Sequence, residues 1–155
     1  MSDSELDRID LRILEVLQRD GRITNAELAE TISLSASACL RRVQRLEQAG
    51  VISGYAARVE PRAVGLGLQA FVRVQLARHD AQSIEHFINR VAESGEVVAC
   101  HALTGDMDYL LHVVVADLDH FSRFLLDRLL NDSGVADVNS SFVLRTVKQT
   151  GALPL

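Results

Sequence analysis

Residues 24–50 read TNAELAETISLSASACLRRVQRLEQAG, and this stretch predicts two short helices joined by a tight turn. Thr24 and Glu27 have the spacing of a capping box, which opens the first helix. The letters SLS at 33–35 mark the turn, Ser35 can cap the second helix, and Gly50 can end it. Two short helices connected in this way form a helix-turn-helix, a motif that places its second helix in the major groove of DNA.

The second helix of this motif has an apolar side and a polar side when its residues are placed at about 100° each. The side predicted to be buried consists of Cys39, Leu40, Val43 and Leu46. The opposite side carries serine, arginine and glutamine, whose polar groups can reach phosphates and base edges. The sequence therefore predicts these DNA contacts: Ser35, Ser37, Arg41, Arg42, Gln44 and Arg45.

A solvated polar face on a helical hairpin is the alternative, because amphipathic helices are common. Two observations favour DNA binding. A solvated face usually mixes lysine with glutamate, whereas this face has arginine and glutamine around a single acid, Glu47. Residues 31–62 also carry five arginines and two acids, a net +3 in a chain whose net charge is −5. Because salt confines the relevant field to about 8–10 Å, a local basic face can bind DNA on an acidic protein.

Upstream of the motif, the sequence predicts one more helix. Its apolar residues share one stripe: Leu6, Ile9, Ile13, Val16 and Leu17. Gly21 is expected to end this helix in the left-handed conformation. Downstream of the motif, residues 51–61 have strand-like sequence, and Pro61, Gly65 and Gly67 mark a linker.

The second part of the chain predicts a different architecture, with strands and helices in the order β-α-β-β-α-β, the ferredoxin-like split pattern. The expected strands are residues 68–77, 96–103, 109–116 and 135–147, and the expected helices are residues 80–94 and 117–130. The predicted fold class is therefore α+β. We expect a DNA-binding domain with a linking strand in residues 1–60, a linker in residues 61–67 and the βαββαβ domain in residues 68–155.

The composition excludes several classes of protein. The chain has 155 residues, 48% hydrophobic and 24% charged, which suits one compact domain or two small ones. Its apolar runs are too short to span a membrane, and its acidic N-terminus lacks the order of a signal peptide. Cys39 and Cys100 lie far apart, which favours two reduced cysteines. We therefore expect a cytoplasmic protein.

Residues 104–108, TGDMD, place two carboxylates beside a glycine in the turn between two predicted strands. Asp and Gly are common in turns, so local backbone hydrogen bonding is one explanation. If His101 and His112 faced each other across the hairpin, the two histidines and Asp106 and Asp108 could ligate a metal. The sequence offers no third catalytic partner and no phosphate-binding loop, so we expect neither enzymatic activity nor a cofactor. The remaining interpretation is that these carboxylates bind the ammonium group of a small ligand.

Two long stretches of this chain resemble a known family. LDRIDLRILEVLQRDGRITNAELAETISLSASACLRRVQRLEQAGVISGY is similar to the N-terminal DNA-binding domain of the Lrp/AsnC (feast/famine) transcription regulators. CHALTGDMDYLLHVVV, followed by a helix and GVADVNSSFVLRTVKQT, is similar to the amino-acid-sensing domain of that family. The resemblance covers nearly the whole chain in the same order. It implies a winged-type helix-turn-helix domain followed by a sensing and oligomerisation domain.

The resemblance also implies partners. Members of the family are dimers whose βαββαβ domains pair sheet to sheet, and the dimers often assemble into tetramers or octamers. The Gly-Asp-x-Asp loop helps to form an effector pocket between neighbouring dimers. This implies an amino-acid ligand and the following effector-binding residues: Thr104, Gly105, Asp106, Asp108, Ser140 and Ser141.

At two positions the chain departs from the family pattern. Ser33 stands in the turn where many such motifs have glycine, and the backbone angle there costs a non-glycine residue about 1 kcal/mol. Arg41 stands where some members have an acid, so the base preference of a relative does not transfer. Two other functions stay open: a DNA-bending architectural protein that ignores amino acids, and an amino-acid-regulated metabolic subunit, against which the arginine face argues.

Overall fold

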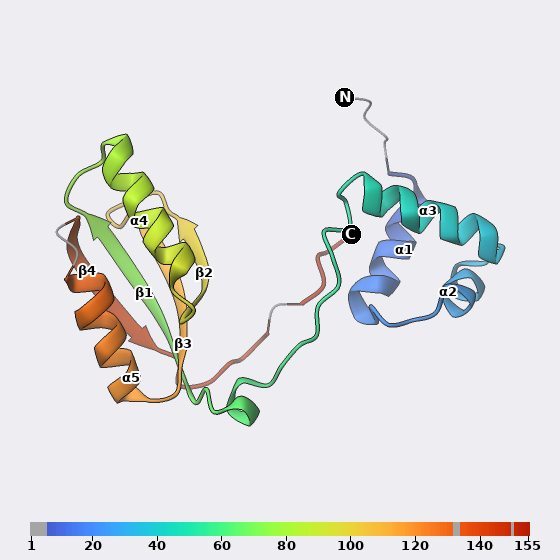
Figure 1. The fold of residues 1–155 in the computed structure, drawn as a ribbon. Coiled ribbons are helices and arrows are strands. Elements are labelled where there is room, and N and C mark those ends of the chain that lie inside the picture. Colours follow the sequence, from blue (N-terminus) through green and yellow to red (C-terminus); the bar gives the residue numbers. More distant parts are fainter. Residues whose placement is uncertain (1–5, 132–133, 150) are drawn as a thin grey trace. The chain divides into compact units, whose positions relative to one another are not determined.

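In the computed structural model, which describes residues 6–131, 134–149 and 151–155, the chain divides into two compact units (Figure 1). The first unit comprises residues 1–58 together with residues 148–155, and the second comprises residues 59–147. The sequence placed residues 148–155 with the second domain. They group with the first unit because the side chain of Gln18 bonds the backbone of Leu153, accepting from its N–H at 2.5 Å and donating to its carbonyl at 3.4 Å.

Three helices form the first unit: α1 (Arg8–Arg19), α2 (Asn25–Ile32) and α3 (Ala36–Gln48). Thr24 and Glu27 form the predicted capping box of α2, and the Ser35 hydroxyl caps α3 by accepting from the N–H of Ala38 at 3.3 Å. The buried core consists of Ile13, Leu28, Ala29, Ile32, Cys39 and Leu46. This arrangement confirms the helix-turn-helix. Leu40, which we expected to be buried, is 45% exposed, because α3 packs on the core through Cys39 and Leu46.

Turn conformations agree with the sequence at two positions and differ at a third. Ser33 takes the left-handed conformation at φ 62°, and Gly50 follows α3 at φ 73°. Gly21, in contrast, is not among the described residues with positive φ, and α1 ends in an extended Asp20 at φ −139°. Our expectation that a left-handed Gly21 ends this helix was wrong.

The predicted strand after α3 is also absent. Residues 51–60, all within the described part of the chain, form no strand, and a 3₁₀ turn, η1 (Pro61–Val64), follows them. A strand needs a partner strand for its backbone hydrogen bonds. The sequence of residues 51–61 has the composition of a strand, but the single chain supplies no partner for it.

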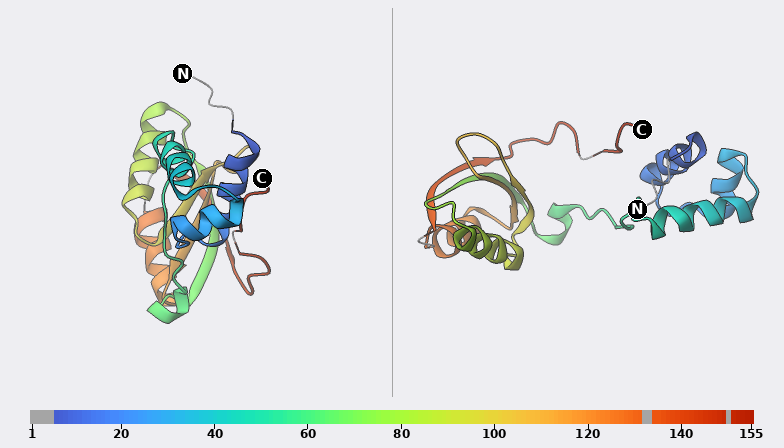
Figure 2. Two further views of the ribbon diagram at one scale, coloured as in Figure 1. Left: turned by 90° about the vertical axis from the view of Figure 1, so that its right-hand side faces the viewer. Right: turned by 90° about the horizontal axis from the view of Figure 1, so that it is seen from above.

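The second unit has the predicted element order: β1 (Leu68–Leu76), α4 (Ala81–Glu93), β2 (Val97–Ala102), β3 (Tyr109–Val115), α5 (Leu118–Arg123) and β4 (Val135–Phe142). A π-helical segment, η2 (Phe124–Leu130), continues α5. The strands form one antiparallel sheet in the order β2-β3-β1-β4. Both helices cover the same face of the sheet (Figures 1 and 2). No helix among the described residues has the length and apolar character needed to cross a membrane.

Alternating side chains divide the sheet into a core face and an open face. On the core face, β1 buries Ala70, Val72, Val74 and Leu76 against the helices. On the open face, Phe71 is 41% exposed and stacks on His112 of β3 with 4.7 Å between the ring centroids. None of the described residues of this unit forms a layer over the open face, as the βαββαβ order predicts.

Candidate functional site

The outward side of α3 presents a short polar surface. Ser37, Arg41 and Gln44 are all exposed there, and Arg41 forms no ion pair with any residue that the structure describes. The hydroxyl of Ser35 lies 3.4 Å from that of Ser37 and is occupied with capping the helix. This surface can supply hydroxyl, guanidinium and amide groups to a ligand outside the protein.

Two other arginines of α3 form ion pairs with the acidic residues at the start of α1. Nη1 of Arg42 lies 2.7 Å from Oδ2 of Asp7 and 2.8 Å from Oδ1 of Asp10. Nη2 of Arg45 lies 2.5 Å from Oδ2 of Asp10. Asp7 is the N-cap of α1 and Asp10 is in its first turn. The structure thus joins α3 to the start of α1 through two guanidinium groups.

The charges in this cluster are mutually stabilised. The N–H of Asp10 and the guanidinium of Arg42 hold the pKa of Asp7 below its usual range. Hydrogen bonds to Asp7 and Asp10 raise the pKa of Arg42. Asp10 itself has no exposed surface. Asp10 was not among the residues predicted from the sequence, although a charged residue beside the apolar stripe of α1 is the signal that could have indicated a buried partner.

Loop 103–108, between β2 and β3, holds most of the predicted effector residues. Its ends are joined by a bond from the N–H of Leu103 to the carbonyl of Asp108 at 2.8 Å, and Gly105 takes φ 111°. Thr104, Gly105 and Asp106 are exposed at the tip of this loop. A carboxylate beside open backbone N–H groups can meet both charged ends of an amino acid.

Asp108 has a different environment. Its Oδ2 accepts from the N–H of Leu76 at 2.7 Å, and its Oδ1 lies 2.9 Å from Nε2 of His79. Its own N–H donates to the carbonyl of Val74 at 2.9 Å. The bond from Leu76, followed by the contacts with His79, lowers the pKa of Asp108. Asp108 therefore fastens the loop to the end of β1, whereas Asp106 on the same loop has an exposed side chain.

Ser140 and Ser141 do not join this loop within one chain. Ser140 is paired with Val72 on the core face, and Ser141 is paired with Phe71 on the open face. Both lie on β4, and β1 separates that strand from β3. In the described part of one chain, the predicted effector residues therefore lie in two separate places, on loop 103–108 and on β4.

The histidine arrangement considered for a metal is not formed. His101 pairs with Leu110, and His112 pairs with Ala99, so the two histidines are diagonal rather than opposite. His112 lies 3.1 Å from Oε1 of Gln69, and burial lowers its pKa. The described residues contain no group of three or more histidine, cysteine or acidic side chains placed to hold a metal ion.

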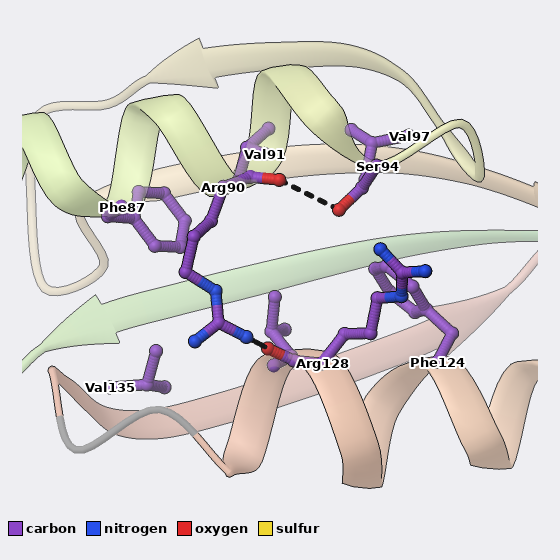
Figure 3. A pocket seen from close by; sticks show the side chains of 9 residues that line it. Phe87, Arg90, Val91, Ser94, Val97, Phe124, Arg128 and Val135 are labelled. Carbon is purple, nitrogen blue, oxygen red and sulfur yellow. Dashed lines mark hydrogen bonds between the residues drawn. The ribbon is translucent and has the colours of Figure 1, made fainter.

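A small cavity lies between α4 and η2, where Arg90 extends to the carbonyl oxygen of Arg128 and the hydroxyl of Ser94 donates to the carbonyl of Arg90 (Figure 3). Its volume is about 10 Å³. A cavity of that size has room for about one water molecule. It is too small for an amino acid.

Two family models match this chain and between them span both units. The winged helix-turn-helix DNA-binding model matches residues 6–53, and the Lrp/AsnC ligand-binding domain model matches residues 69–153. This chain belongs to the Lrp/AsnC family. The family resemblance of the sequence and the α+β fold are thereby confirmed.

Individual Lrp/AsnC relatives match over almost their full length. The chain is 40% identical to the Bkd operon transcriptional regulator of Pseudomonas aeruginosa over 98% of this chain and 99% of the relative. It is 41% identical to the leucine-responsive regulatory protein of Escherichia coli over 96% and 91%. Among solved structures, a transcriptional regulator of Neisseria meningitidis in complex with L-Met is 50% identical, with a TM-score of 0.92 over 96% of both chains.

These matches establish the class of function. The protein is a transcriptional regulator of the Lrp/AsnC family with a DNA-binding helix-turn-helix and an amino-acid-binding domain, and it is not an enzyme. They also exclude the metabolic-subunit alternative, since the matching relatives are named as regulators. The contacts of α3 and of loop 103–108 can therefore be interpreted as parts of a DNA-binding surface and a ligand-binding surface.

Proposed function

We propose that this regulator binds specific double-stranded DNA through the outward side of α3, and that an amino acid bound at loop 103–108 changes its DNA binding or its assembly. The observation that carries the first part is the exposed group Ser37, Arg41 and Gln44 on the second helix of the motif. In a helix-turn-helix this side enters the major groove, where such side chains meet bases and phosphates.

The proposed effector is a neutral amino acid with an apolar side chain, such as methionine or leucine. One relative forms an L-Met complex and others are named leucine-responsive. Loop 103–108 provides Asp106 for the ammonium group and the N–H groups around Gly105 for the carboxylate. Leu103, which is 40% exposed, offers an apolar contact for the side chain.

The proposed assembly is a homodimer or a larger even-numbered oligomer, working in the cytoplasm where the DNA is. The open face of the sheet and the separation of Ser140 and Ser141 from the loop support this, since a second copy can supply what one chain lacks. Residues 51–60 would likewise gain a partner strand. For the domain boundaries we propose residues 1–60 and 68–147 joined by the linker 61–67, with residues 148–155 returning to the first unit.

The DNA part is tested with Arg41→Ala in a binding titration against a DNA site selected by the wild-type protein from random sequence. Each lost phosphate contact lowers the slope of log affinity against log salt by about 0.9. We expect that loss for each DNA-bound subunit in Arg41→Ala. The matched control is Arg123→Ala, which removes one exposed arginine from α5 and should leave the slope unchanged. An unchanged slope in Arg41→Ala contradicts the role of α3.

The effector part is tested by a thermal-shift screen of the twenty amino acids, because ligand at a hundred times its dissociation constant stabilises the folded state by about 2.7 kcal/mol. Titration calorimetry of Asp106→Asn with the best ligand follows. A charge-assisted bond contributes about 1.5–3 kcal/mol, so the affinity should fall about ten- to hundred-fold. If no amino acid changes the melting temperature or the DNA affinity, the protein acts as an effector-independent architectural DNA-binding protein instead.

A further inference from the structure

A carboxylate without any exposed surface lies behind the DNA-contacting helix. Asp10 of α1 accepts from three groups: Nη1 of Arg42 at 2.8 Å, Nη2 of Arg45 at 2.5 Å and the N–H of Asp7 at 3.1 Å. Both of its oxygens are therefore occupied. The two arginines are three residues apart on α3, so they lie on the same side of that helix and one carboxylate can hold both.

The two arginines differ in exposure. The side chain of Arg42 is 27% exposed and that of Arg45 is 48% exposed. Arg42 is held by two acids, since Asp7 binds the same nitrogen at 2.7 Å. Each guanidinium is thus already paired with a carboxylate of the protein, and a DNA phosphate would have to compete with that carboxylate.

Burial of Asp10 is not the arrangement that maximises stability. Removing a charge from water is expensive, and apolar residues of similar volume often stabilise a protein as well as a buried ion pair. A carboxylate that binds two guanidinium groups gives the contact a preferred direction, because its oxygens favour donors that lie near their plane. The rotation of α3 about its own axis decides which of its side chains point outward, and the contacts of Asp10 with Arg42 and Arg45 join that helix to α1.

We propose that Asp10 is a positioning residue for DNA recognition: through Arg42 and Arg45 it sets the rotation of α3, and it leaves Arg41 as the arginine of this helix that contacts DNA directly. The inference rests on the proposed role of α3 in DNA binding. It reassigns Arg42 and Arg45, which the sequence predicted as DNA contacts, to an ion-pair network within the domain, in which Arg42 is mostly covered and Arg45 is half-exposed.

The first test compares salt slopes of Arg41→Gln, Arg42→Gln and Arg45→Gln, each of which replaces a charged guanidinium with a neutral polar amide. On the wild-type-selected site, Arg41→Gln should lower the slope by about 0.9 for each bound subunit. Arg42→Gln and Arg45→Gln should weaken binding and leave the slope unchanged. If they lower the slope as much as Arg41→Gln does, they contact phosphate and the inference is wrong. If Arg41→Gln also leaves the slope unchanged, the proposed DNA role of α3 fails instead.

The second test separates orientation from folding by using Asp10→Asn on two DNAs, the selected site and a random sequence of equal length. Loss of folded protein weakens both affinities by the same factor. A misrotated helix loses base contacts and keeps its charge, so the ratio of the two affinities should fall. The double variant Asp10→Asn/Arg42→Gln should show the ratio of Asp10→Asn alone, because both changes break one network. An unchanged ratio in folded Asp10→Asn overturns the proposal, and if that variant does not fold, the same ratio measured in Arg42→Gln decides.

Discussion

In both helix α3 and loop 103–108, some charged side chains bind other groups in the described part of the protein and one does not. In each, the sequence shows a cluster of like charges, and the structure turns part of the cluster inward. On α3, Arg42 and Arg45 bind Asp10, while Arg41 forms no ion pair with any described residue. On the loop, Asp108 binds the N–H of Leu76 and the ring of His79, while Asp106 is exposed.

The difference between the two regions lies in the inward partner. Asp10 is a side chain on another helix, more than thirty residues earlier in the chain. The partner of Asp108 is a backbone N–H at the end of a neighbouring strand, with an exposed histidine beside it. A side-chain partner can be removed by mutation, whereas a backbone partner stays behind unsatisfied. The inward charges should therefore respond differently to substitution.

Removing the buried carboxylate behind α3 should have the largest effect on the free energy of unfolding. Asp10→Ala leaves two arginines without their shared carboxylate, and removing one partner of a buried ion pair typically costs about 3–5 kcal/mol. We expect a loss at the low end of that range, because both guanidiniums can turn toward solvent. Hydrogen exchange in peptides of α1 and α3 measures it. Asp7→Ala is the control, and a loss as large as that of Asp10→Ala would show that burial of Asp10 is not the cause.

Removing the carboxylate that holds loop 103–108 to β1 should have a smaller effect on the free energy of unfolding. Asp108→Ala leaves the N–H of Leu76 without its acceptor, and an unsatisfied buried donor costs about 1–3 kcal/mol. Asp106→Ala should stay within about 0.5 kcal/mol, as exposed substitutions usually do. Urea unfolding of the two variants makes the comparison within one loop. Equal stabilities would mean that Asp108 does not fasten the loop, and both aspartates would then be available to a ligand.

The sequence predicted the parts of the fold that depend on local pattern. The capping residues Thr24 and Ser35 and the left-handed Ser33 follow from short-range hydrogen bonding and sterics. The βαββαβ order follows from the alternation of strands with apolar helical faces. These features need no knowledge of which elements meet.

The sequence did not predict the features that depend on contacts between elements. The pairing of Asp10 with Arg42 depends on how α1 packs on α3, and nothing in either helix alone specifies it. Whether His101 and His112 face each other depends on the register of the β2–β3 hairpin, which the loop sets, and in the structure Ala99 rather than His101 is paired with His112. The absent strand in residues 51–60 depends on a partner that a single chain does not have. For the same reason, the outward and inward members of each charged cluster could not be told apart.

The dependence of stability on pH should show the contribution of Asp108 in the loop. The folded-state pKa of Asp108 is below its unfolded value, so its contribution to stability is full above about pH 4 and is lost as the pH falls through the lowered pKa. Asp7 is shifted in the same direction. We expect the urea midpoint of the wild type to fall as the pH drops below about pH 4, and to fall less in Asp108→Asn, which has no carboxyl to protonate. A pH dependence in Asp108→Asn as steep as that of the wild type would assign the acid sensitivity to other groups.

The smallest effect is expected in the turn that precedes α3, where the backbone rather than a charged side chain sets the geometry. Ser33 has φ 62° and ψ 44°, a conformation that costs a residue with a Cβ about 1 kcal/mol or more and costs glycine nothing. Glycine loses more freedom on folding, which offsets about half of that gain, so Ser33→Gly should stabilise the first unit by about 0.5 kcal/mol. Thermal unfolding compares it with Ser37→Gly, which places the same residue inside α3 and should destabilise by about 0.5–1 kcal/mol. Because Asp10 and its two arginines hold α3 independently of the turn, Ser33→Gly should bind the selected DNA site as the wild type does. A loss of DNA specificity in this more stable variant would show that the turn, and not Asp10, sets the rotation of α3.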